Sequence, residues 1–288
     1  MRKIGPPAQK DFEYYLKENF IRNCPLTVFD AKRAVKIFGP EVYNLQGKSA
    51  HKQGKHVSTF NPIQVDPLIL REYENDTLCV DNFYVNGNVF FHTITRAMKM
   101  RTVAAVQNRS KTVLLNELKT VLNFYESRNY DITDVHADHE FQCIREEIRP
   151  INLDVAAPDD RVHEIERSIR TVKERVRCTM HSFPFKRIPR VMCRAVVEKA
   201  VRNLNQFPAK DGIADKMSPL TIMTGKPFPD YDNLLLEFGT YVHIYEDNDP
   251  TNTTKARTTP AIALNSTGNE AGAYVVMSLV TGFRRHVH

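Results

Sequence analysis

The chain has 288 residues, of which 42% are hydrophobic and 26% charged, a composition that excludes general disorder. Its apolar runs, such as residues 234–236, are far shorter than the roughly 18–20 residues that cross a bilayer. No apolar stretch follows Met1, which argues against a secretory signal. The five cysteines never form a CxxC pair, which argues against a disulfide scaffold and fits a reducing compartment.

Positive charge is concentrated in one segment of the chain. The net charge is +6, whereas residues 160–210 alone carry 13 Lys/Arg against 5 Asp/Glu, a net charge of +8. Such a basic block indicates a polyanionic partner such as nucleic acid. A solvated helix face is the alternative that charge alone leaves open.

The N-terminal residues 1–56 are predicted to form a helical segment and a linker. Apolar residues recur at helical spacing over 11–20 and 27–38, and Asp30 is placed to cap the second helix. The stretch GKSAHKQGKH at 47–56 predicts the linker.

A strand-rich region follows. Asn86 and Gly87 are a strong tight-turn signal and predict a hairpin between the β-favouring runs 77–85 and 88–95. An apolar stripe predicts an amphipathic helix over 110–128. The same criteria predict further strands at 101–106, 132–138 and 151–156, and helices at 161–180 and 188–206.

The last part of the chain, residues 217–288, is predicted to form an extended connection over 217–233 and then a small β domain. Four short β-favouring runs punctuated by Gly, Asn and Asp predict a β-barrel-like region: GTYVHIYE, PAIALN, GAYVVMSL and GFRRHVH. The order of elements predicts an α/β fold, with a mixed five-stranded sheet and flanking helices in a core over residues 57–216.

Three carboxylates stand out by their positions. Asp81 lies inside a predicted strand, Asp138 ends another, and Glu166 lies on the basic helix. Carboxylates that converge repel one another unless cations bridge them, and Mg²⁺ prefers such oxygen ligands. Two such ions activate an attacking oxygen and stabilise the leaving oxygen at a phosphodiester. The three residues are therefore candidate catalytic and metal-binding groups.

Each carboxylate also has a structural interpretation. A strand Asp such as Asp81 is often a turn or edge residue, and Asp138 is placed to cap the next helix. Glu166 is spaced for an intrahelical ion pair with Arg170. Glu164 and Asp134 are nearby rivals for the same role, although Glu164 lies about 200° around the helix from Glu166.

Cations follow Glu166 along its helix. Steps of four and seven residues reach Arg170 and Lys173, and Arg177 follows. Such a ladder suits a phosphate backbone, which Lys and Arg bind with a strong salt dependence and little sequence preference.

A zinc site is the weaker metal hypothesis. His51, His56, Cys24 and Cys79 carry suitable donor atoms, but their spacing matches no compact zinc motif, so Zn²⁺ is not expected. No phosphate-binding GxxxxGK[ST] loop, GxSxG elbow or HExxH helix occurs, and no small-molecule substrate is expected.

Several blocks in order resemble the integrase region of copia-type LTR retrotransposon polyproteins, over about residues 20–288. LCVDNFYVN holds the first Asp, HADHEF resembles the family's D-N-G-x-E-F, and IERSIRTVKERVR resembles E-R-x-N-R-T. MSPLTIMTGKP and LEFGTYVHIY resemble the downstream T-P-x-E-x-x-x-G-K-K-P and F-G-C blocks. The segment AIALNSTGNEAGAYVVMSLVTG resembles the family's closing β-region.

The resemblance implies an RNase H-like core that binds two Mg²⁺ (or Mn²⁺) ions through Asp81, Asp138 and Glu166. It implies 3′-end processing and strand transfer on DNA, with Arg167, Arg170 and Lys173 beside the metals. It also implies a homo-oligomer, action in the nucleus or in a cytoplasmic particle, and a chain that is part of a larger polyprotein.

The sequence departs from the family in two places. Asp138 and Glu166 are 28 positions apart, which is shorter than usual, and the N-terminal His/His/Cys/Cys module is not recognisable. These departures motivate an alternative, a catalytically inactive or domesticated remnant that binds nucleic acid. A related nuclease or cut-and-paste transposase is a third hypothesis, which the downstream blocks disfavour.

Overall fold

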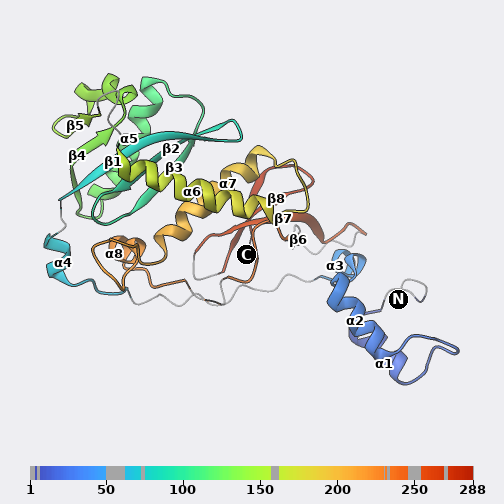
Figure 1. The fold of residues 1–288 in the computed structure, drawn as a ribbon. Helices are drawn as coiled ribbons and strands as arrows, with labels where there is room; N and C mark the ends of the chain where they lie inside the picture. The colour runs from blue at the N-terminus through green and yellow to red at the C-terminus, as the bar shows by residue number, and fades with distance from the viewer. Residues whose placement is uncertain are drawn as a thin grey trace.

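The computed structural model describes residue 4 and residues 7–49, 62–72, 75–156, 162–229, 231, 234–245, 254–268 and 272–287. A five-stranded sheet with helices on both faces lies at one end of the molecule, and a four-stranded sheet lies beside it (Figure 1). Three N-terminal helices project from this body (Figure 1).

The central sheet has the order β3-β2-β1-β4-β5. Its strands are β1 (Asn75–Val85), β2 (Asn88–Thr95), β3 (Arg101–Val106), β4 (Asp131–Ala137) and β5 (Asn152–Val155). The first three strands are antiparallel, whereas β4 runs parallel to β1 and β5 parallel to β4. Asn86 and Gly87 both take positive φ, which fits the predicted turn between β1 and β2. This order, with these directions, is that of an RNase H-like α/β fold.

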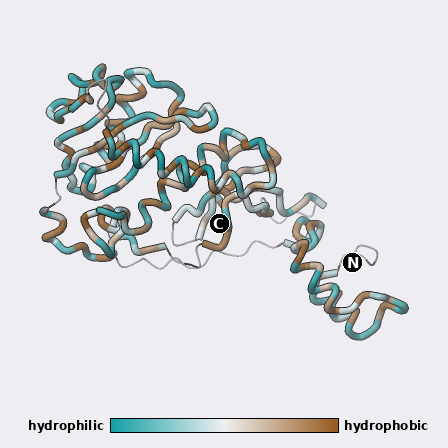
Figure 2. The backbone as a smooth tube through the Cα atoms, viewed as in Figure 1, coloured by the Kyte–Doolittle hydropathy of each residue, from teal (hydrophilic) through white to brown (hydrophobic). Residues whose placement is uncertain are grey.

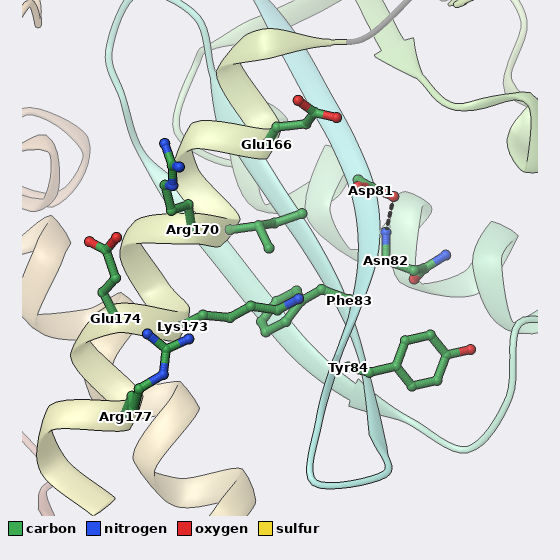
Figure 3. A pocket seen from close by; sticks show the side chains of 10 residues that line it. Asp81, Asn82, Phe83, Tyr84, Glu166, Arg170, Lys173, Glu174 and Arg177 are labelled. Carbon is green, nitrogen blue, oxygen red and sulfur yellow. Dashed lines mark hydrogen bonds between the residues drawn. The ribbon is translucent and has the colours of Figure 1, made fainter. Parts of the chain in front are cut away.

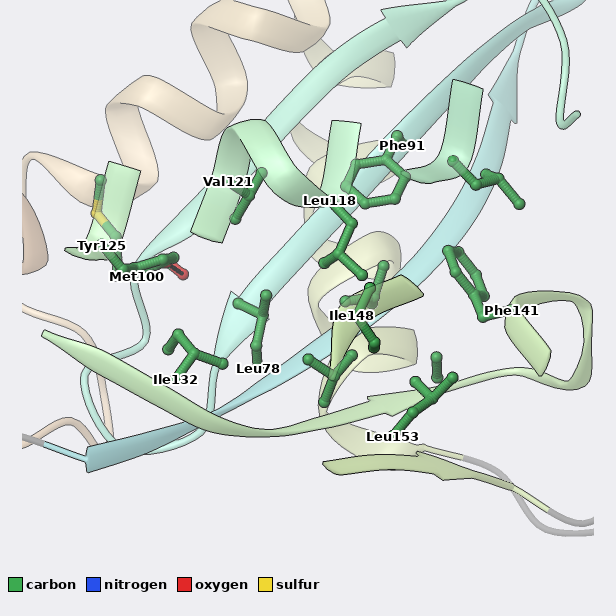
Figure 4. Close-up of a cluster of buried hydrophobic side chains, with 14 of the residues drawn as sticks. Leu78, Phe91, Met100, Leu118, Val121, Tyr125, Ile132, Phe141, Ile148 and Leu153 are labelled. Atoms are coloured by element: carbon green, nitrogen blue, oxygen red, sulfur yellow. Dashed lines mark hydrogen bonds between the residues drawn. The ribbon is translucent and has the colours of Figure 1, made fainter. Parts of the chain in front are cut away.

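One face of the sheet is covered by α5 (Lys111–Glu126) and by the 3₁₀ segment η2 (His139–Ile148). Their apolar side chains enclose a core with alternate residues of the strands, as Figure 4 shows around Leu118 and Phe141. Leu118 has no solvent-exposed surface because α5 presents its apolar stripe to the sheet.

The opposite face is covered by α6 (His163–His181) and α7 (Arg190–Asn205). The buried stripe of α6 is Ile165, Ile169, Val172 and Val176, at the spacing that the sequence predicts. Most of its other positions are polar, and its Lys and Arg side chains lie on the outside of the helix.

The C-terminal strands are β6 (Tyr241–Tyr245), β7 (Thr258–Ser266), β8 (Tyr274–Ser278) and β9 (Arg284–Val287). They form an antiparallel sheet in chain order, so β6 and β9 lie at opposite edges and the sheet is open rather than closed. Leu264 and Met277 join the apolar cluster under α6 and α7, and Asn265 donates to the Ala195 carbonyl at 3.2 Å. Within 217–233, where an extended connection was predicted, Ser218 caps a short helix, α8 (Pro219–Thr224).

The N-terminal segment contains α1 (Gln9–Lys17), α2 (Val28–Phe38) and α3 (Val42–Lys48), and α4 (Pro67–Glu72) precedes the core. Thr27 and Asp30 form a capping box at the start of α2. Hydrophobic stretches lie along these helices (Figure 2), yet Phe29 is 69% and Phe38 84% exposed. Among the described helices, none is both long and apolar enough to cross a membrane.

Candidate active site

Asp81 lies where the central sheet opens. β4 pairs with β1 only as far as Val80, which faces Ala137, whereas β2 pairs with β1 through to Val85. Because side chains alternate along a strand, Asp81 shares the α6 side with Cys79 and Phe83. The strand Asp is therefore held in place by β2 and reachable from the opposite edge.

The other two predicted carboxylates lie on neighbouring elements. Asp138 directly follows β4 and occupies the N-cap position of η2, but its side chain makes no capping hydrogen bond. Glu166 lies in the first turn of α6 and lines the same groove as Asp81. In Figure 3 the Glu166 side chain extends from α6 towards the strand that carries Asp81. The structure thus brings Asp81 and Glu166 into one groove, whereas Asp138 lies near the same end of the sheet without lining that groove.

The electrostatics around Asp81 are dominated by negative charge. Burial, which is the largest cause, and the nearby carboxylate of Asp138 together raise the pKa of Asp81 to about 7. Glu140 and Glu166 act in the same direction, against a 2.6 Å hydrogen bond that the Asn82 N–H donates to Asp81 Oδ1. A cation bound here would relieve this repulsion.

The carboxylates around Asp81 form a possible donor set for a divalent cation. Carboxylate oxygens from a strand, a strand end and a helix are the ligands that Mg²⁺ prefers, and their mutual repulsion fits a cation between them. In the part of the chain that the structure describes, however, no three His, Cys, Asp or Glu side chains lie close enough together to hold one metal ion. The chemistry of these carboxylates fits a metal ion, whereas their side chains are farther apart than the ligands of a formed metal site.

Cations of α6 line the groove beside Asp81. The groove encloses about 510 Å³, and Arg170, Lys173 and Arg177 form its helical wall. Lys173 Nζ lies 5.7 Å from the centre of the Phe83 ring on the opposite wall. Arg167 instead lines a second hollow of about 540 Å³, together with His163, Glu166 and Arg170. The predicted cations therefore lie on both sides of Glu166.

The rival carboxylates have other partners. Glu164 Oε1 accepts from Arg96 Nε at 2.9 Å. Asp134 Oδ1 accepts from Asn152 Nδ2 at 3.0 Å, which links β4 to β5. Both interactions are structural, and neither rival lines the groove beside Asp81.

Two residues of the weaker zinc hypothesis, His51 and His56, lie outside the described residues. Cys79 is fully buried in β1, and burial raises the pKa of its thiol to about 11. Cys79 therefore packs in the apolar cluster under α6 as a protonated thiol.

Sequence reasoning missed a link through Glu140. Asn82 Nδ2 donates to Glu140 Oε1 at 2.6 Å, and Arg109 Nη1 donates to Glu140 Oε2 at 2.9 Å. The link ties β1, next to Asp81, to the segment that begins with Asp138. Its signal in the sequence is the Glu of HADHEF, the block that also contains Asp138.

A buried network behind α6 was also missed. His92 Nδ1 lies 2.7 Å from the Thr102 carbonyl oxygen, so it carries the hydrogen, and Nε2 accepts from the Ser168 hydroxyl at 2.8 Å. Arg101 Nε donates to the same hydroxyl oxygen at 3.1 Å. Burial lowers the pKa of His92 to about 4, which keeps the ring neutral. The network fixes α6 to the sheet two residues beyond Glu166, and its signal was a histidine inside the apolar strand NVFFHTIT.

Comparison with known proteins adds a structural neighbour. No protein-family model matches the chain, and no curated protein sequence matches it significantly. Among solved structures, the catalytic core domain of BIV integrase is similar at 13% sequence identity and a TM-score of 0.38, over 51% of this chain and 92% of that domain. A likeness at this TM-score supports no functional assignment, so the RNase H-like fold is assigned from strand order and helix positions.

Proposed function

We propose that this chain is an integrase core of the copia retrotransposon type, which processes DNA 3′ ends and transfers the strand into target DNA. The observation that carries the proposal is the placement of Asp81, at the open end of an RNase H-like sheet, in one groove with Glu166 and the α6 cations. Asp138 completes the set, because its charge acts on Asp81.

Each residue has a role in this reaction. Asp81, Asp138 and Glu166 would hold two Mg²⁺ or Mn²⁺ ions, which supply charge stabilisation for an in-line displacement at phosphorus. Arg170, Lys173 and Arg177 would bind the phosphates of the strand and orient it along the groove.

The partners follow from the same assignment. DNA is the substrate, as element ends and as target, and the basic face of α6 binds both through phosphate contacts. Two ends must be joined to one target together, so the acting species is a homo-oligomer. Its place of action would be the nucleus or a cytoplasmic particle of a retrotransposon.

A second candidate function is an inactive or domesticated DNA-binding remnant. The open spacing of the carboxylates favours it, since the described residues contain no ready three-ligand metal group. This candidate keeps the cationic wall and needs no chemistry at Asp81.

A strand-transfer assay tests the proposal. The substrate is a branched DNA that a core domain resolves without knowledge of the element ends, with Mg²⁺ or Mn²⁺. The wild type is compared with Asp81→Asn and Asp138→Asn, and the matched control is Asp134→Asn on the same strand as the Asp138 segment. We expect metal-dependent product from the wild type and from the control, and at least a 100-fold loss in the other two variants.

A second measurement tests the remnant. Folded wild type that binds duplex DNA but yields no product would favour it. Reversing Arg170 and Lys173 to Glu should then lower duplex affinity and reduce the salt slope by roughly one for each lost phosphate contact. Unchanged affinity in the double variant would remove both candidates, because both bind DNA along α6.

A further inference from the structure

The two sides of β1, the strand that carries Asp81, present different side chains. Asp81 and Phe83 point towards α6, whereas Asn82 and Tyr84 point to the opposite side, as Figure 3 shows for Tyr84. The Tyr84 side chain is large and apolar, yet the residue is 48% exposed. Because β4 stops pairing at Val80, no strand among the described residues pairs with this edge of β1 from Asp81 to Val85.

Tyr84 is held by a series of fixed contacts. The Arg109 guanidinium carbon lies 5.7 Å from the centre of the Tyr84 ring, and Glu140 fixes Arg109. Glu140 is fixed in turn by Asn82 on the same strand as Tyr84. The ring therefore has a defined position, about 10 Å from Asp81 along an extended strand, and part of its surface remains open to solvent.

We propose that Tyr84 is a stacking platform for an unpaired base of the DNA strand whose phosphate lies at Asp81. The inference rests on the proposed function and names the form of its substrate, a strand with at least one unpaired nucleotide next to the reacting phosphate. Phosphates lie along Arg170 and Lys173 on the α6 side, and the strand crosses the open edge of β1. Its base then meets Tyr84 and the Arg109 guanidinium on the far side.

The chemistry of both sides supports a nucleotide as the occupant. A cationic wall selects the phosphate, whereas an aromatic ring next to an Arg plane selects a base by stacking. Stacking of this kind accepts any base, which suits an enzyme that acts on different target sequences. A paired base in a duplex presents no free face, so the platform requires unpairing.

The alternative is that Tyr84 only supports Arg109. In that case the loss of the ring would weaken the link to Glu140 and lower stability, without a specific effect on unpaired DNA. A test must therefore separate stacking from support.

The experiment uses the full chain and a duplex with a short unpaired 3′ end that contains 2-aminopurine, a base whose fluorescence falls on stacking. No divalent cation is added, so no strand is cut. The variants are Tyr84→Ala and Tyr84→Phe, and the control is Tyr241→Ala, since Tyr241 is 52% exposed in the C-terminal sheet. Thermal unfolding of each variant checks that it is folded.

Wild type, Tyr84→Phe and Tyr241→Ala should quench the probe, because the ring and not its hydroxyl stacks. Tyr84→Ala should not, and its affinity for the unpaired end should fall about 5- to 150-fold. Its affinity for a blunt duplex should change less than twofold. Equal quenching by folded Tyr84→Ala, or equal loss on the blunt duplex, would overturn the platform while leaving the integrase proposal intact. Failure of the wild type to bind any DNA would overturn both.

Discussion

The two faces of the central sheet both bury apolar side chains, but they bury different polar groups. The α5 face encloses the cluster around Leu118 and Phe141. The α6 face encloses a second apolar cluster, the neutral imidazole of His92 and the approach to Asp81. Apolar burial does not depend on pH, whereas buried ionisable groups do. We therefore expect both faces to contribute to stability through apolar burial and the α6 face to contribute most of its pH dependence.

The largest expected effect is a loss of core packing on the α5 face. Leu118→Ala should lower the free energy of unfolding by about 3–4 kcal/mol, because Leu118 is fully buried and a cavity remains. Urea unfolding at pH 5 and pH 7 should give the same loss. Leu115→Ala, three residues earlier on the same helix at a partly buried position, should cost less. A loss that changed with pH would contradict the division between the faces.

The second effect is the pH dependence from the α6 face. The pKa of His92 is about 4 when folded and 6.5 in the unfolded chain, so stability is lost as pH falls through that window. The pKa of Asp81 is about 7 when folded and 3.8 unfolded, so its contribution is lost as pH rises from about 4 to about 7. The two slopes oppose each other between about pH 4 and 6.5.

Asp81→Asn should reveal the pH dependence of stability that comes from His92, because it removes the opposing contribution of Asp81. The variant should gain stability with rising pH by up to about 1.4 kcal/mol per pH unit relative to the wild type. Urea unfolding at pH 4.5, 5.5 and 6.5 measures it, and His92→Gln should show a slope of the opposite sign. Parallel curves for wild type and Asp81→Asn would mean that Asp81 titrates normally.

The third effect is a broken hydrogen-bond network. Ser168→Ala should lower stability by about 1–3 kcal/mol, because His92 Nε2 and Arg101 Nε then lose a buried partner. Thr171→Ala is the control on the same helix, since its hydroxyl bonds only the Arg167 carbonyl within α6. Guanidinium unfolding compares them. Equal losses in the two variants would show that the network adds no stability of its own.

Local sequence signals predicted most of the core. The strands at 88–95 and 101–106 have the predicted bounds because their apolar runs end at clear turn signals. The 3₁₀ segment η2 is missing from the sequence prediction, although its buried residues Phe141, Ile144 and Ile148 recur at helical spacing and pack in the cluster under α5. The short helices α3, α4 and α8 were also missed, since each spans two turns or fewer.

The sequence predicts only those residues of the candidate site that have a local signal of their own. Asp81 interrupts a β-favouring run, and Glu166 precedes a series of cations at helical spacing, so each is a candidate and the sequence predicts that they converge. The link from Asn82 to Glu140 joins residues 58 positions apart, and that from His92 to Ser168 joins residues 76 apart. Spacing along the chain does not indicate such pairs, because they form only when the sheet brings the elements together.

The smallest effect concerns the ion pair at the edge of the α6 face. Burial acts to raise the pKa of Glu164, but its backbone hydrogen bond and the Arg96 guanidinium outweigh burial and lower it. Both side chains are partly exposed, so Arg96→Gln should cost only about 0.2–1 kcal/mol at low salt and less at 1 M salt. Urea unfolding at 0.05 M and 1 M NaCl measures the difference. A loss above about 2 kcal/mol at both salt concentrations would mean that Arg96 holds α6 against the sheet. The position of Glu166 would then depend on this pair as well as on Ser168 and His92.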